Sequence, residues 1–554
     1  MKLSPEAFNI LEELSSPGAH RAAYLTPRNV RLLATLSRVD PERHAAIMVK
    51  LTGWAQLSDL KAAVKRWLAE ADDIRARSKT EKKVQEAASS GRPVIERGAP
   101  RDTAERFRAE RHQHLYFAEG EWLEYEVNCY QPREELHVRS LLSAFMAEGV
   151  DSETGEDFKP GKRDVDEAMD ALRSLAFRND LSPPTWIDYW PGIDPDPKKV
   201  IVVRNGLLDL TNGYLYSSTP RFFTRNGLTY AYDPDAPEPE AFLAFLESIW
   251  PEHGVPPDVA AANRQNKMTL QEVIGHLLTG DTWYQKLFLF MGQSRGGKGV
   301  LTRAITKLIG KANVASQSAT KLGKEFGLKA LIGKLLLIIP DLRFGRNSNL
   351  NPTIIEMLLS ISGEDDVAVG RKFLDDWSGK LNTRILLASN MELVLPDQSG
   401  ALHNRLIPLV FTRSFADNPD VTLDDKLAAE LPSILNWAIE GLKRLEARVD
   451  ERGYRQGFII PPEGKKVLKE IARQGSTVQA FLRERCIMGR DQYVPKEALF
   501  EAFEEWCVEA DIVSHHVLET FAKEVRVASG YNVTATRKRI DNERVYCFTG
   551  VALA

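Results

Sequence analysis

The sequence predicts an α/β fold built on a parallel sheet. Three apolar runs with almost no polar side chain span 287–291, 335–339 and 385–388. Continuous apolar runs are typical of parallel strands that are buried on both faces. The first run passes directly into a glycine-rich loop that ends in Lys298, and a helical pattern follows. Strand, glycine-rich loop with lysine, and helix is the order of a phosphate-binding P-loop.

The loop reads Gly292-Gln-Ser-Arg-Gly-Gly-Lys298. Backbone N–H groups of such a loop cradle phosphate oxygens, and the lysine reaches the β- and γ-phosphates of a nucleotide. The residues expected to contact the nucleotide are Gly292, Gly296, Gly297, Lys298, Gly299 and Val300. The alternative is a glycine-rich turn that binds no nucleotide.

Polar residues follow the other two apolar runs. Asp341 and Asn390 each stand just after a predicted strand, at the edge where open α/β sheets bind ligands. Asp341 is predicted to bind Mg²⁺ in the Walker B position, and Asn390 to orient the attacking water. Gly299 replaces the usual Ser or Thr ligand, so the ion is held either through water and an acidic residue or by Thr302.

The general base is not evident from the sequence. Pro340 stands where an acidic neighbour of the Walker B aspartate is often found, which leaves Glu325 and Glu364 as candidates.

Five short motifs surround these residues: Leu-Thr-Gly-Asp (278–281), Gly-Lys-Gly (297–299), Glu-Phe-Gly-Leu (325–328), Ile-Ser-Gly-Glu-Asp (361–365) and Ser-Gly-Ala-Leu (399–402). Together with the loop, Asp341 and Asn390, they resemble the phage and plasmid primase–helicase branch of superfamily 3 helicases. The resemblance implies an AAA+-like ATPase core that uses ATP and Mg²⁺ and forms a ring, expected to be a hexamer. It also implies that Arg405 completes the ATP site of a neighbouring subunit, with Arg413 as the weaker candidate. A surface arginine that caps a strand is the alternative for Arg405.

A hairpin is predicted over 367–381, after a helix that begins at Pro352. The resemblance places the DNA-binding hairpin of the family here. Arg371 and Lys372 are expected to grip phosphate, and Phe373 to meet bases or sugar. An ordinary solvated turn is the alternative.

The chain has 554 residues, a net charge of −4, 43% hydrophobic residues and 27% charged residues. This composition is typical of a globular protein of several domains and excludes a strongly basic chain, so DNA contacts must come from local patches. The four cysteines are widely spaced, without a zinc-binding pattern, and no apolar run approaches a membrane span. We therefore expect a cytoplasmic protein that does not bind a membrane.

Six segments are expected along the chain. They are a helical N-terminus (1–74), a charged linker or solvated helix (75–112), an α/β collar or oligomerisation domain (113–250), the ATPase (251–420), a helical extension (421–462) and a winged helix (463–554). In the collar-type domain, Trp186 and Trp190 are expected in the core. In the winged helix, the residues expected to contact DNA are Lys523, Arg526, Arg537, Lys538 and Arg539. A winged helix that contacts protein is the alternative.

The sequence thus supports the hypothesis of an ATP-dependent DNA helicase that replicates a phage, prophage or plasmid element. It would translocate 3′ to 5′, by family resemblance, on single-stranded or forked DNA, and a separate primase or other replication proteins would act beside it. The alternatives are an ATP-gated origin-binding initiator or scaffold that unwinds little, and a P-loop motor that packages DNA or remodels protein.

Overall fold

The structure is a computed structural model. It describes residues 4–14, 16, 21–342, 352–371, 374–390, 401–415, 420–474, 477–510, 514, 516–529, 532–540 and 543–554. The chain divides into two compact units. Unit 1 comprises residues 1–115 and 133–177, and unit 2 comprises residues 116–132 and 178–554.

Unit 1 is mainly helical. Its elements are α1 (Pro5–Leu14), η1 (Arg21–Leu25), α2 (Pro27–Val39), α3 (Pro41–Lys50), α4 (Leu57–Ser89), β1 (Val94–Ile95), α5 (Pro100–Glu110), α6 (Glu135–Glu148), β5 (Val150–Asp151) and α7 (Lys162–Ala176). The first four helices share a core that contains Leu11, Leu33 and Leu60. Proline is the first residue of both α2 and α3, where its missing N–H leaves no helical hydrogen bond unmade.

Helix α4 differs from the predicted boundary at residue 74. It continues to Ser89, so the first part of the charged segment is helix, and β1 and α5 occupy much of the rest. Oppositely charged side chains of this segment form ion pairs along the helix, as in Arg77–Asp73 and Lys82–Glu86. Such i,i+4 pairs support a helix whose surface is mostly solvated.

Unit 2 begins with small antiparallel sheets. Their strands are β2 (Leu115–Ala118), β3 (Glu121–Glu126), β4 (Cys129–Arg133), β6 (Thr185–Trp186), β7 (Val200–Val203), β8 (Gly206–Asp209), β9 (Leu215–Tyr216) and β10 (Phe222–Phe223), and η2 spans Pro197–Lys199. Glu119 and Gly120 form the turn between β2 and β3. Trp186 is buried as expected, but the expectation for Trp190 is wrong, because 52% of this residue is exposed.

A five-stranded parallel sheet forms the centre of unit 2. Its strands are β11 (Leu287–Gly292), β12 (Val314–Ser316), β13 (Leu336–Ile339), β16 (Arg384–Ser389) and β17 (Leu406–Phe411), in the order β12-β13-β16-β11-β17. The predicted α/β class and parallel sheet are therefore confirmed. Strand β16 pairs with both β11 and β13, so the carboxyl ends of these three strands lie next to one another.

Helices cover both faces of this sheet. On one face, Phe288, Phe290 and neighbouring strand residues pack against α8 (Glu240–Ile249), α9 (Pro257–Leu278), α10 (Lys298–Ile309) and α15 (Leu431–Ala447). On the other face, Leu287 and Leu289 join a core with α12 (Pro352–Gly363), α13 (Ala401–Arg405) and α16 (Pro462–Gln474). Alternate residues of β11 thus enter two different cores, which explains its uninterrupted apolar sequence.

Six short elements complete the described part of unit 2 between residues 311 and 429. They are η3 (Lys311–Asn313), α11 (Ala319–Leu322), η4 (Gly327–Leu331), the hairpin strands β14 (Asp366–Arg371) and β15 (Leu374–Lys380), and α14 (Leu423–Ala429). The hairpin predicted over 367–381 is confirmed as an antiparallel pair.

The C-terminal part has its own hydrophobic core, which begins at Val478. It contains α17 (Thr477–Arg485), α18 (Lys496–Glu509), α19 (Leu518–Ala528) and a sheet of β18 (Cys486–Pro495), β19 (Thr534–Ile540) and β20 (Glu543–Leu553), in the order β18-β20-β19. Helix α16 packs instead on the central sheet through Ile471, so the predicted boundary at 463 falls within the first turn of a helix that belongs to the central core. The four cysteines are free thiols. In the described part of the chain, no helix is both long enough and apolar enough to span a bilayer.

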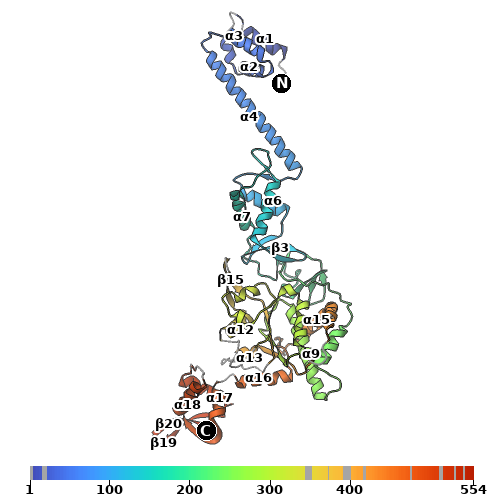
Figure 1. Cartoon of the computed structure of the whole chain (residues 1–554), viewed down its shortest axis with the longest axis vertical. Helices are drawn as coiled ribbons and strands as arrows, with labels where there is room; N and C mark the ends of the chain where they lie inside the picture. Colours follow the sequence, from blue (N-terminus) through green and yellow to red (C-terminus); the bar gives the residue numbers. More distant parts are fainter. Residues whose placement is uncertain are drawn as a thin grey trace. The chain divides into compact units, whose positions relative to one another are not determined.

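Helices α9 and α15 lie side by side in unit 2 (Figure 1) and approach closely. Glu272 of α9 is fully buried and accepts hydrogen bonds from Arg444 Nε at 3.0 Å and Arg448 Nη2 at 2.6 Å. A Cβ on Gly275 would lie 2.3 Å from the carbonyl oxygen of Ala438. This crossing therefore requires glycine.

We expect Gly275→Ala to destabilise the protein, because its methyl group would force the two helices apart. Overpacking of this kind costs about 1–3 kcal/mol. Gly457→Ala is the matched control, since a Cβ there meets no atom within 4 Å. Thermal unfolding should show a lower Tm for the first variant and an unchanged or slightly higher Tm for the second. Equal Tm values would contradict the proposed close packing.

Candidate active site

The loop after β11 has the conformation that its glycines allow. Gly292 has φ 154°, Arg295 has φ 59° and Gly297 has φ 90°. A Cβ on Gly292 would lie 2.0 Å from the carbonyl oxygen of Phe411 on β17. Glycine is therefore required where the loop leaves the sheet, because the backbone of the neighbouring strand occupies the space of a side chain.

Lys298 is the first residue of α10 and is only 7% exposed. Its Nζ donates to the carbonyl oxygens of Gly292, at 2.8 Å, and Gln293, at 2.6 Å. Burial lowers the pKa of the Lys298 ammonium below its usual value. An anion beside the loop would favour the charged form, and the N-terminus of α10 adds its positive dipole end.

Gly299 and Val300 lie in the first turn of α10. A Cβ on Gly299 would be 3.4 Å from its nearest neighbour, Nη1 of Arg303, so a small side chain fits there. The Thr302 hydroxyl donates to the carbonyl oxygen of Lys298 at 2.8 Å, within its own helix. This backbone contact gives the hydroxyl a structural partner independent of any metal ion.

The structure brings Asp341 and Asn390 together at the carboxyl edge of the sheet. Both side chains are exposed, and Asn390 Nδ2 lies 3.5 Å from Asp341 Oδ1. The chain after Asp341 is fixed to β16, because the N–H of Leu342 donates to the carbonyl oxygen of Ala388 at 2.7 Å. Asp341 itself has φ 51°, a strained backbone conformation that is found often at functional sites.

These residues suit a magnesium ion bound with a nucleotide. Mg²⁺ is usually held by one or two carboxylates together with phosphate oxygens and water, and Asp341 offers one accessible carboxylate. Across the described residues, no group of three or more His, Cys, Asp or Glu side chains could hold a metal ion. A site of this kind would therefore depend on the nucleotide for its other ligands.

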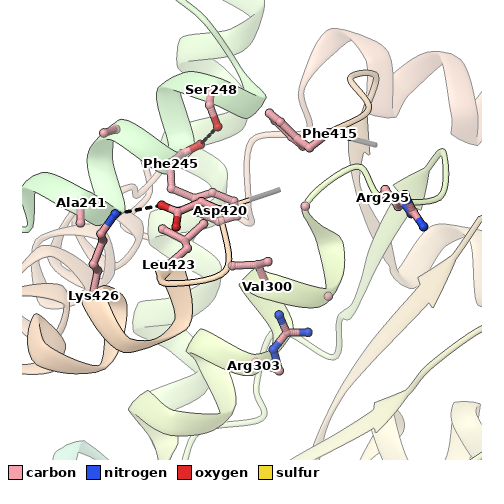
Figure 2. A pocket seen from close by; sticks show the side chains of 13 residues that line it. Ala241, Phe245, Ser248, Arg295, Val300, Arg303, Phe415, Asp420, Leu423 and Lys426 are labelled. Atoms are coloured by element: carbon pink, nitrogen blue, oxygen red, sulfur yellow. Dashed lines mark hydrogen bonds and ion pairs between the residues drawn. The ribbon is translucent and has the colours of Figure 1, made fainter. Parts of the chain in front are cut away.

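A pocket of about 880 Å³ adjoins the loop (Figure 2). Ala241, Ala244, Phe245 and Ser248 of α8 line it, with Arg295, Gly297, Gly299, Val300 and Arg303 of the loop and α10, and with Phe415, Asp420, Leu423 and Lys426. The volume is within the range of about 300–1,000 Å³ that is usual for small-molecule and cofactor sites.

The polar groups of this pocket are mostly engaged. Lys426 Nζ donates to Asp420 at 2.9 Å, and Ser248 donates to the carbonyl oxygen of Phe245 at 2.6 Å (Figure 2). The rest of the lining, beside the Gly292–Lys298 loop, is mainly apolar, and an apolar lining suits a flat aromatic ring.

Sequence reasoning missed this pocket. Its α8 residues recur at positions 241, 244, 245 and 248, which is the spacing of one helical face. That stripe of small and aromatic residues was the available signal, but nothing in the sequence showed that it faces the loop.

Arg405 lies at the opposite edge of the sheet from Lys298. It is half-buried, directly precedes β17 and donates through Nη1 to the hydroxyl of Ser362 at 2.8 Å and to the carbonyl oxygen of Leu359. Lys286 lies nearby, and burial and the Arg405 charge lower the pKa of its ammonium. Sequence reasoning did not identify Lys286 as a neighbour of Arg405.

Glu364 also lies at this opposite edge. It accepts a hydrogen bond from Thr282, shortly before β11 begins, and this position does not suit a general base for the loop of its own chain. Glu325 is exposed, and its carbonyl oxygen lies near Gly370 of the β14–β15 hairpin.

The expectation that Arg371 faces DNA does not match its position. Only 7% of the residue is exposed, and its Nη1 donates to the carbonyl oxygen of Glu119 at 3.1 Å. A phosphate ligand has to be accessible to solvent, and this guanidinium is enclosed by another part of unit 2. Lys372 and Phe373, the other two predicted contacts, lie outside the described residues.

The five C-terminal residues predicted to contact DNA lie on α19 and β19. Lys523, Arg526, Arg537 and Arg539 are exposed, and Lys538 is half-buried. The Arg537 guanidinium lies 4.3 Å from the ring centre of Tyr546, and Lys538 Nζ lies 4.0 Å from that of Tyr493. The structure thus presents a basic surface with aromatic rings on this sheet.

We expect Gly292→Ala to weaken binding of a fluorescent adenine nucleotide by more than about tenfold, because the methyl group would push the loop away from Phe411. Gly299→Ser is the matched control, since a side chain fits there and restores the usual P-loop residue. Binding measured by fluorescence anisotropy should be retained in the control. Normal binding by Gly292→Ala would show that the loop does not hold phosphate in this conformation.

Comparison with known proteins identifies two segments. Residues 104–251 match the family described as D5 N terminal like, and residues 290–405 match a family of unknown function, DUF5906. Two apo structures of the NrS-1 C terminal region are similar to the chain. The first has a TM-score of 0.43 and 10% sequence identity, and the match covers 79% of this chain and 96% of that chain. The second has a TM-score of 0.45 and 12% sequence identity, and the match covers 82% of this chain and 100% of that chain. At these TM-scores and sequence identities, the similarity shows no shared function. The family matches support a relationship to phage primase–helicase proteins, because the D5-like segment is followed in one chain by the segment that carries the loop, Asp341 and Asn390.

Proposed function

We propose that this chain is an ATP-hydrolysing DNA helicase of the superfamily 3 type, with an AAA+-like core, that serves the replication of a phage, prophage or plasmid element. The observation that carries the proposal is the loop of Gly292–Lys298, which adjoins an apolar pocket and shares a sheet edge with Asp341 and Asn390. The pocket would take the base and the loop the phosphates. The D5-like match supports the assignment to phage replication.

Each residue of the site would have a distinct role. Lys298 would exchange its two carbonyl contacts for phosphate oxygens, and Asn390 would orient the water beside Asp341. Asp341 would hold Mg²⁺, which neutralises charge on the phosphates when bound. The strand order supports these roles, because β16 lies between β11 and β13 and so brings Asn390 between the loop and Asp341.

Arg405 would act on a neighbouring subunit. Residue 405 precedes the six residues of β17, whose other end pairs with Gly292, so about 20 Å of strand separates it from the loop of its own chain. An arginine finger neutralises transition-state charge only in direct contact. The distance therefore favours action in trans, from a ring of subunits expected to be a hexamer.

DNA would be contacted at two places. Lys372 and Phe373, which stand between β14 and β15 in the sequence, remain proposed contacts with the translocating strand. The basic surface of α19 and β19 would bind DNA as a winged helix does, through Lys523, Arg526, Arg537, Lys538 and Arg539. Single-stranded or forked DNA is the proposed substrate, and a separate primase would work beside the ring.

A second candidate is an ATP-gated initiator or scaffold with little turnover. The observation that favours it is that no general base is evident among the described residues, since Glu364 is bound to Thr282 and Pro340 follows β13. ATP-dependent ring assembly without hydrolysis would support this candidate. Hydrolysis linked to remodelling of protein, without unwinding, would support a different P-loop motor.

The in-trans role of Arg405 can be tested by mixing inactive variants. Lys298→Ala and Arg405→Ala should each reduce DNA-stimulated ATP hydrolysis at least about 100-fold. Mixed subunits should regain activity, because an intact Lys298 site can then face an intact Arg405. ATPase assays and unwinding of a 3′-tailed duplex would measure this. Two inactive proteins that stay inactive when mixed would contradict a shared site.

The Mg²⁺ ligand can be assigned with a pair of variants. Asp341→Asn should lower turnover at least about 100-fold, because it removes the carboxylate that would hold the ion. Thr302→Val should retain turnover within about twofold, since the Thr302 hydroxyl already has a structural partner. Steady-state ATPase rates over a Mg²⁺ titration distinguish the two. A raised Mg²⁺ requirement in Thr302→Val would assign the ion to Thr302 instead.

A further inference from the structure

The turn between β2 and β3 contacts the root of the β14–β15 hairpin. Glu119 and Gly120 form this turn with φ values of 53° and 74°. The carbonyl oxygen of Glu119 accepts a hydrogen bond from Arg371 Nη1 at 3.1 Å. Arg371 pairs with Leu374 and is the last described residue of β14 before the hairpin tip.

Gly120 leaves the space that the Arg371 guanidinium occupies in this contact. A Cβ there would lie 2.5 Å from Arg371 Nη2 and 3.0 Å from Nη1, so any larger residue has to displace the guanidinium. The turn therefore encloses Arg371 from one side and leaves it only 7% exposed.

The same turn is tied to the central sheet. The Glu119 and Glu121 carboxylates pair with Arg225, at 3.4 Å and 2.7 Å. The adjoining Asn226 donates to the carbonyl oxygen of Gly333 at 2.9 Å, shortly before β13. The two arginines are thus held by one turn, and the turn is anchored next to the strand that leads to Asp341.

The root of the hairpin is also packed in the core of the sheet. Val369 and Trp377 are paired across the hairpin and lie in the same buried cluster as Leu337 and Ile339 of β13. Ile339 is the last residue of β13, two positions before Asp341. The hairpin root is thus bounded by the ATPase core on one side and by the Glu119–Gly120 turn on another.

We infer that the Glu119–Gly120 turn is a clamp that positions the β14–β15 hairpin, and that it couples ATP hydrolysis to the hairpin's contact with a DNA strand. This inference rests on the proposed function. The clamp residues touch neither nucleotide nor DNA and are positioning residues. A fixed root is needed because motion at Asp341 reaches the hairpin tip only if the hairpin moves as one body.

The test is Gly120→Ala, compared with Gly453→Ala. Gly453 has a similar φ of 81°, but a Cβ there meets no atom within 4 Å, so both variants carry the same backbone strain and only the first displaces Arg371. We expect Gly120→Ala to reduce the stimulation of ATPase by single-stranded DNA at least about fivefold, the lower end of typical coupling between sites. Basal ATPase should stay within about twofold of wild type.

A double variant separates the clamp from general damage. If Gly120→Ala acts by displacing Arg371, then adding it to Arg371→Ala should cause no further loss of DNA stimulation, because the two changes affect one contact. Additive losses, or DNA stimulation in Gly120→Ala equal to that in Gly453→Ala, would overturn the inference.

Failure of the clamp and failure of the proposed function give different results. A wild-type chain without ATPase activity would reject the proposed function. The contact between Gly120 and Arg371 would then be tested by thermal unfolding of the single variants Gly120→Ala and Arg371→Ala and of the double variant. Non-additive changes in Tm would support the contact, and additive changes would reject it. Normal wild-type activity with an unaffected Gly120→Ala variant would reject only the clamp.

Discussion

The candidate site depends on the position of β11, which is paired along both edges and covered on both faces. A strand held in this way cannot shift along its neighbours without exposing one of two cores. The loop after it therefore begins at a fixed point, where Gly292 touches the backbone of β17 and Lys298 folds back on the loop carbonyls. The pocket of α8 and the Asp341–Asn390 pair are placed relative to that point.

Much of this core could be predicted from the sequence. Runs without polar residues predict strands buried on both faces, and the polar residues after them predict ligands at one sheet edge. The structure places Asp341 and Asn390 3.5 Å apart at that edge. The strands and the proximity of these two side chains could be predicted because each depends on local sequence and on a general rule about parallel sheets, and the role of the two side chains as ligands stays a prediction. The pocket lining could not be predicted, since α8 and Phe415 are far apart in sequence and meet only in the fold.

The expectation for Arg371 is wrong because of a contact between residues far apart in the sequence. Arg371 looks like a DNA contact because a hairpin tip is usually solvated, yet a turn about 250 residues earlier in the chain covers it. The charged residues of α4, by contrast, pair along an exposed helix, which is one of the two alternatives that the sequence offers for this segment. These i,i+4 partners can be found from the local sequence, whereas the partner of Arg371 is found only in the fold.

The distance between Arg405 and the Lys298 loop has a consequence for control of the protein. If the proposed function holds, a chain that carries the two halves of its reaction centre at opposite edges of one sheet would be inactive when alone. Its ATPase activity would rise steeply with the local concentration of the chain, since each added subunit would complete the site of one neighbour and need a second neighbour to complete its own. Dilution would then act as an off switch, and gathering of chains on a DNA substrate as an on switch, without any separate inhibitor.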